Sequence, residues 1–115
     1  MSQNRNKLID LFIGNISNSI VHRILEKAIN DENIRKYYDK EFLTSLDIAK
    51  KYRKNINPID TPLPAKDIKY IKEKITKKVK AELELRISKG YKNINIGLVE
   101  PIVNGVLEET KVICS

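Results

Sequence analysis

The stretch AKDIKYIKEKITKKVKAELELRISKG, residues 65–90, decides the fold class of this chain. Its apolar residues recur in steps of three and four, which places them on one stripe of an α-helix. The stripe consists of Ile68, Ile71, Ile75, Val79, Leu83 and Ile87. Pro64 stops any upstream helix from running in, Asp67 suits the positive helix end, and Gly90 closes the helix because it tolerates positive φ. We therefore predict a long helix over 66–89.

Two further helices are predicted upstream of this stretch. The broad apolar pattern of residues 6–30 indicates a helix that is buried on more than one side, either continuous or jointed near 14–18, where turn-forming residues gather. Asn30 or Asp31 caps the next helix, which ends near Asn55. The proline-rich segment that follows is predicted to be an ordered, extended loop, because proline fixes φ.

The C-terminal part is predicted to contain a short strand and a last helix. Ile94, Ile96 and Leu98 alternate with polar or small residues, which is typical of an extended strand. Pro101 suits the first position of a helix, and we expect the chain to fray after Lys111. Helices dominate the whole pattern, so the predicted fold class is all-α.

Composition indicates one folded domain spanning residues 1–115. Apolar residues make up 41% of the chain and charged residues 32%, which is typical of a folded protein. The lone Cys114 cannot form an internal disulfide, and no apolar run approaches the roughly 18–20 residues of a membrane span. No signal peptide is recognised at the N-terminus, so the expected compartment is the cytoplasm.

The sequence offers no constellation for catalysis, metal binding or cofactor binding. It has no Cys/His cluster and no glycine-rich phosphate loop. His22 is the only histidine, and it is expected to be a surface residue rather than a ligand or base. We therefore predict a protein that is not an enzyme and that carries no metal and no cofactor.

Positive charge is concentrated in the middle of the chain. The chain carries a net charge of +7, while residues 50–80 alone hold eleven Lys or Arg and three acids, a net of +8. A localised basic field is what a polyanion-binding surface needs. The alternative interpretation is a solvated helix face in a lysine-rich protein.

Residues 42–109 resemble a histone fold. The run KGYKNI, residues 89–94, occupies the place of an AGRKTI-like run that follows the central helix of archaeal histones. The run LVEPIVNGVLEE, residues 98–109, is similar to DLPITKGLQE at the last helix of small histone-fold-like proteins. The resemblance implies a long central helix flanked by shorter ones, with a core over 41–112 and an extra N-terminal helical extension over 1–40. Tyr91 departs from the pattern, because the family has an arginine there.

The resemblance also implies a homodimer that binds double-stranded DNA through the phosphate backbone without reading sequence. The expected phosphate contacts are Arg53, Lys54 and Lys66, beside Lys89 and Lys92 from a second chain. The expected dimer interface is the apolar stripe of the long helix together with Arg86, which comes five full turns after the first stripe residue and pairs with Glu82. These interface residues are Ile68, Ile71, Ile75, Val79, Leu83, Arg86 and Ile87.

Two other functions remain open from the sequence. The chain is alternatively a helical-bundle assembly or interaction protein, such as a virion or complex subunit, whose basic face is incidental. It is also a candidate RNA-binding protein that stacks bases on Tyr52, Tyr70 or Tyr91.

Overall fold

The computed structural model describes residues 5–58 and 61–113, and these residues form four α-helices and one short 3₁₀ turn. The elements are α1 (Arg5–Ala28), α2 (Glu32–Ile56), α3 (Ala65–Ser88), η1 (Ile96–Leu98) and α4 (Val99–Glu109). The prediction of an all-α fold is confirmed. The long helix predicted over 66–89 is present as α3. It is one of three long helices of nearly the same length, since α1, α2 and α3 have 24, 25 and 24 residues.

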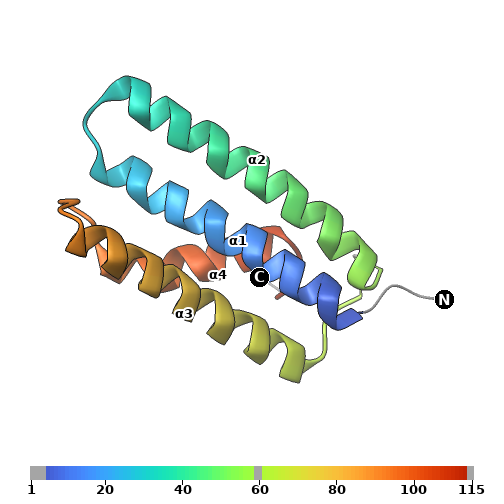
Figure 1. Ribbon diagram of the computed structural model, residues 1–115. Helices are drawn as coiled ribbons and strands as arrows, with labels where there is room; N and C mark the ends of the chain where they lie inside the picture. Colours follow the sequence, from blue (N-terminus) through green and yellow to red (C-terminus); the bar gives the residue numbers. More distant parts are fainter. Residues whose placement is uncertain (1–4, 59–60, 114–115) are drawn as a thin grey trace.

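α1 is the central helix of the fold. Figure 1 shows it lying between α2 and α3, and it packs against α2, α3 and α4. α4 packs against α1 and α3, and so it covers one face of the three-helix layer. This position explains the sequence of α1, whose buried residues occupy most of its circumference and include Phe12, Ile16 and Leu25. α1 therefore holds the core together, and α3 is one of the helices that it supports.

The predicted stripe of α3 is buried within the same chain. Ile71, Ile75, Val79 and Leu83 are each 0% exposed and belong to the core cluster that α1 and α4 complete. Burying one such aliphatic side chain stabilises the fold by about 1.5–3 kcal/mol. The stripe thus fixes α3 to the bundle and leaves the opposite side of the helix in water.

α1 continues without a joint through residues 14–18, where turn-forming residues allowed either one helix or two. The apolar face of α1 continues across this segment through Ile13 and Ile16, and burial of that face outweighs the weak helix preference of Gly14. The Asn15 amide Nδ2 donates to the Leu11 carbonyl oxygen at 2.9 Å, so its side chain stays within the helix.

The strand predicted around Ile94–Leu98 is wrong. Within the described residues this segment has no neighbouring strand to pair with, and a single extended segment leaves its backbone groups without partners. Asn93 adopts a positive φ of 67°, and the Asn95 side chain accepts from the Gly97 amide at 2.9 Å, which starts η1. α4 follows at once from Val99, so Pro101 is its third residue and not its first.

The helix ends agree with the predicted caps. Asp31 caps α2, because its Oδ1 accepts from the amides of Asn33 and Ile34 at 2.9 and 3.2 Å. Gly90 has a φ of 101°, the conformation expected where α3 closes. The C-terminal turn is not frayed after Lys111, since Val112 is buried in the core. Cys114 lies outside the described residues.

Candidate nucleic-acid interface

α3 carries seven lysines outside its buried stripe. Six are exposed and Lys80 is half-buried, and none of the seven forms an ion pair with a carboxylate in the described part of the chain. The set is Lys66, Lys69, Lys72, Lys74, Lys77, Lys78 and Lys80. An unpaired ammonium group on the surface keeps its full charge available to an external anion. α3 therefore carries more lysines without a carboxylate partner than any other helix of the described structure.

The carboxylates of α3 do little to neutralise these lysines. Asp67 pairs with Arg5 of α1, and Glu82 pairs with Arg86 through a 2.9 Å contact between Oε2 and Nε. Glu73 and Glu84 are the other acids of the helix. Seven lysines thus face two acids that are not already held by an arginine.

Four of the lysines form one ridge along the outside of α3. At 100° per residue, Lys66, Lys69, Lys77 and Lys80 lie within an arc of about 80° on the side opposite the core. From Lys66 to Lys80 the helix rises about 21 Å at 1.5 Å per residue. We call these four residues the α3 ridge, and its length matches about six base-pair steps of duplex DNA at 3.4 Å each along one strand.

Arg53 was expected to contact a phosphate, and the structure contradicts this expectation. Its side chain is 0% exposed, and burial lowers the pKa of its guanidinium group, which nevertheless stays charged at neutral pH. Nε and Nη2 donate to the Lys111 carbonyl at 3.1 and 2.8 Å, Nη1 donates to Asn57 Oδ1 at 2.6 Å, and Nη2 also donates to the Thr61 carbonyl at 3.2 Å. Arg53 therefore fastens the C-terminal turn and the loop after α2 to the bundle.

The other four expected contact residues are exposed but do not form one cluster in a single chain. Lys54 lies near the end of α2 and Lys66 near the start of α3, whereas Lys89 and Lys92 follow the end of α3. Lys66 and Lys89 are 23 residues apart, about 35 Å along the helix. Within one chain, the other α3 lysines lie along the helix between Lys66 and Lys89.

The residues expected at a dimer interface are mostly committed to the core of the monomer. Ile71, Ile75, Val79 and Leu83 are fully buried and Ile68 is partly buried, while Ile87 remains exposed. The four fully buried residues cannot form an interface between two chains in this fold, because their surface is already covered. Arg86 is half-buried and has Glu82 as its partner within the chain, as the sequence required.

The three tyrosines considered for base stacking lie in different environments. Tyr52 is partly buried against the core. The Tyr70 hydroxyl donates to Asp10 Oδ1 at 3.1 Å, which raises the pKa of Tyr70, and Lys74 Nζ lies 5.8 Å from its ring centroid. Tyr91 lies beside Arg86, whose Cζ is 5.5 Å from the ring centroid. They do not form a shared stacking platform.

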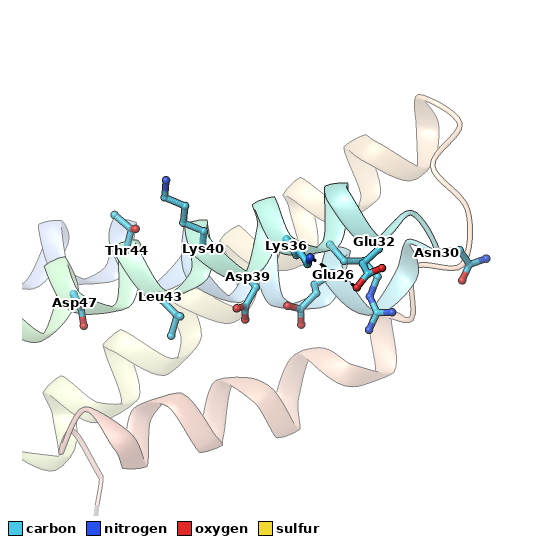
Figure 2. Close-up of a pocket in the computed structure, with 10 residues that line it drawn as sticks. Glu26, Asn30, Glu32, Lys36, Asp39, Lys40, Leu43, Thr44 and Asp47 are labelled. Atoms are coloured by element: carbon cyan, nitrogen blue, oxygen red, sulfur yellow. Dashed lines mark ion pairs between the residues drawn. The ribbon is translucent and has the colours of Figure 1, made fainter.

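A hollow of about 680 Å³ lies along α2 and the end of α1. Figure 2 shows Glu26, Asp39 and Leu43 pointing to the same side, while Lys40 points away. Arg23 Nη1 lies 2.6 Å from Glu26 Oε1 and 3.4 Å from Asp39 Oδ1, so one guanidinium group is shared between the two carboxylates. The hollow offers alternating surface charge rather than a catalytic or metal-binding constellation, and the described residues contain no group of three or more metal-binding side chains.

No family model, curated protein or solved structure matches this chain. No helix in the described ranges is long and apolar enough to cross a membrane. The cationic surface of α3 is therefore the feature from which a function is argued.

Proposed function

We propose that this protein binds double-stranded DNA through the phosphate backbone, with the lysines of α3 as its contact surface and without sequence readout. The observation that carries the proposal is the set of seven α3 lysines that face water with no described carboxylate partner.

The physical basis is the release of counterions from DNA. Each phosphate that a lysine neutralises frees condensed cations, and this supplies affinity that does not depend on sequence. The backbone of α3 is held in place because its opposite side is buried in the core, so only the lysine side chains have to be ordered on binding. Lys89 and Lys92 follow directly after α3 and extend the positive charge beyond the end of the helix.

The chemistry of the ridge favours phosphate over base contacts. Lysine presents a compact charge on a flexible stem, whereas base readout relies on planar bidentate groups such as arginine or asparagine. Tyr52 is partly buried, Tyr70 is bonded to Asp10 of α1 and Tyr91 lies beside Arg86 after α3, so the three rings do not form the row of faces on which single-stranded nucleic acid stacks. Duplex DNA is therefore the preferred polyanion.

Fluorescence anisotropy with a labelled duplex of mixed sequence tests the proposal. In the double variant Lys69→Ala/Lys77→Ala, the slope of log K against log salt is expected to flatten by about two units if both residues touch phosphate. The matched control is Lys36→Ala/Lys40→Ala, which removes two exposed lysines from α2 and is expected to leave the slope unchanged. Equal effects of the two pairs would indicate a diffuse basic surface and would contradict the assignment to α3.

A second variant separates the ridge from a histone-like arrangement. If the loop lysines of two chains combine, Lys89→Ala/Lys92→Ala flattens the slope more than the ridge variant does. Contact through the α3 ridge predicts the reverse order. If the unmodified protein does not retard a duplex at 50 mM salt, DNA binding is excluded and the interaction-protein alternative stands.

A further inference from the structure

One face of α1 remains uncovered along the middle of the helix. α2 and α3 flank α1, and α4 packs on the bundle as a fourth element, yet Asp10, Gly14 and Asn18 are exposed. These three residues are spaced by four, so they form a line along one side of the helix. We call this line, with the side chains of α2 and α3 that border it, the α1 groove.

The α2 border of the groove is partly apolar. The Asn18 amide Nδ2 donates to Ser45 Oγ at 3.2 Å, which places Ser45 at the edge of the groove. Ile48 follows Ser45 by three residues and Tyr52 follows Ile48 by four, so all three lie on one side of α2. Ile48 is 38% exposed, and Tyr52 lines a surface hollow together with Leu11 of α1.

The α3 border combines apolar and cationic side chains. Lys78, Glu82 and Arg86 line a hollow of about 350 Å³ with Gly14, Ser17 and Asn18. Tyr70 is tied to Asp10 by its hydroxyl group. Leu85 follows Glu82 by three residues and Lys78 by seven, which puts it on the same border. Tyr70 and Leu85 are 43% and 48% exposed, a large apolar area to leave in water.

Gly14, on the floor of the groove, destabilises α1, and the packing of the chain does not require a glycine at this position. A glycine inside a helix is less stable than alanine by about 1 kcal/mol. A Cβ added at Gly14 would meet no atom within 4 Å, so nothing in the described fold requires a glycine there. Ser17 Oγ, at the same hollow, is buried without a hydrogen-bond partner. Missing bulk and an unpartnered hydroxyl group leave room for an external backbone to approach α1.

We propose that the α1 groove binds an acidic amphipathic α-helix from a partner protein. A helix laid along α1 fits a long border on each side, with apolar side chains against Ile48 and Leu85 and carboxylates facing Lys74 and Lys78. The groove lies beside the α3 ridge. Lys78 lines the hollow along α1, and Lys74 Nζ lies 5.8 Å from the ring of Tyr70, which is bonded to Asp10. The two surfaces meet at the start of α3, where Lys66 of the ridge lines a hollow with Asp10 and Tyr70.

The charge of the groove selects this occupant over a second copy of the chain. The groove is bordered by three cations, Lys74, Lys78 and Arg86, and two carboxylates, Asp10 and Glu82, and of the cations only Arg86 has a carboxylate partner among the described residues. The hydrogen bond from the neutral Tyr70 hydroxyl leaves the negative charge of Asp10 in place. Three cations against two carboxylates leave the groove with a net positive charge, so it is short of negative charge. A second copy would bring the same lysines against these, which raises the electrostatic free energy instead of lowering it.

Titration with a synthetic peptide tests the site. The probe is a labelled 18-residue helix with leucine at positions i, i+3, i+4 and i+7 of each repeat and glutamate beside them, and its counterpart carries lysine in place of glutamate. Saturable binding of the acidic probe alone is expected, with amide shifts in NMR spectra at Gly14 and Asn18. Failure of the acidic probe to bind, or equal binding of both probes, would overturn the proposal.

Two glycine variants provide a matched pair. Gly14→Leu fills the groove, while Gly105→Leu adds the same side chain on α4, where a Cβ also meets nothing within 4 Å. Gly14→Leu is expected to weaken probe binding at least about tenfold, the loss that 1.4 kcal/mol of binding free energy represents, and Gly105→Leu is expected to leave it unchanged. Equal effects of the two variants would refute the assignment to the groove.

A charge reversal keeps the proposal testable should Gly14→Leu disturb the fold. Lys74→Glu/Lys78→Glu is expected to exchange the preference, so that the lysine probe binds and the glutamate probe does not. An unchanged preference would overturn the assignment. Two other results would also overturn the proposal, provided that the acidic probe does not bind. Self-association that Gly14→Leu abolishes would show that the occupant is a second copy of the chain. Binding to anionic vesicles that Gly14→Leu abolishes would show that it is a membrane surface.

Discussion

Replacing Arg53 with methionine tests how the fold holds its C-terminal turn. The substitution keeps a flexible side chain of similar length but removes the guanidinium group and all of its donors. Four oxygen atoms then lose a donor: the carbonyl oxygens of Asn57, Thr61 and Lys111, and Asn57 Oδ1. The loop after α2 and the C-terminal turn are then no longer joined through this side chain.

The magnitude follows from these hydrogen bonds. Hydrogen bonds to a charged group contribute about 1.5–3 kcal/mol each, but they are not additive. Residues Thr61 and Lys111 are exposed, so water can replace part of what their carbonyl oxygens lose. We expect Arg53→Met to lower the free energy of unfolding by about 3 kcal/mol. For a chain of this length that corresponds to a fall in Tm of about 10–15 °C.

Urea denaturation followed by circular dichroism at 222 nm measures this difference. Lys54→Met is the matched control, because Lys54 is the neighbouring residue, has the same charge and is exposed. The control is expected to change the free energy of unfolding by less than about 0.5 kcal/mol. If Arg53→Met and Lys54→Met destabilise the protein equally, the structural role assigned to Arg53 is refuted.

Three further predictions concern the pH response, the assembly state and a helix cap. Burial lowers the pKa of His22 despite the opposing charge of Glu41, so its contribution to stability is fully present above about pH 6.5, the pKa in the unfolded chain, and falls as the pH drops below that value. The decrease in Tm between pH 7.5 and pH 5.5 should therefore be smaller in His22→Gln than in the unmodified protein. An equal decrease in both proteins would contradict this. Sedimentation equilibrium at tens of micromolar should return the 13.3 kDa monomer, because the α3 stripe is buried within the chain, and a stable dimer would show that another surface pairs. Asp31→Ala should destabilise the protein by about 1 kcal/mol in thermal melts while Asn30→Ala does not, and equal losses would contradict the assignment of the cap.

Local signals in the sequence were sufficient to predict most of the helices. The limits of α3, a cap at Asn30 or Asp31 and the closing Gly90 depend on nearest neighbours along the chain. All three predictions are confirmed, and the structure identifies Asp31 as the cap. The strand around Ile96 was wrong because alternating apolar residues also fit a turn that places them against a core. The spacing of apolar residues alone cannot distinguish a strand from such a turn, because a strand also needs a neighbouring strand with which to pair.

The contact residues were harder to predict, because exposure depends on tertiary packing. Arg53 belongs to the basic segment of residues 50–80, which was identified from composition. It also continues the helical series of buried residues Phe42, Leu46 and Ala49, which are separated by steps of three and four. That spacing placed it on the buried side of α2 and was the signal available in the sequence. The buried α3 stripe was assigned to a second chain because the histone resemblance implies a partner there. The broad apolar pattern of residues 6–30 was visible in the sequence, but a pattern along the chain does not show that α1 packs on α3.

Salt dependence of duplex binding tests the central claim most directly. If four to six phosphates are neutralised, the slope of log K against log salt should be about −4 to −5, and raising the salt from 50 to 200 mM should weaken binding by about two to three orders of magnitude. When unlabelled single-stranded DNA is added as a competitor, the labelled duplex should remain bound to the protein. A slope near zero, or loss of the duplex to the single strand, would contradict the assignment of the α3 lysines as a surface for duplex DNA.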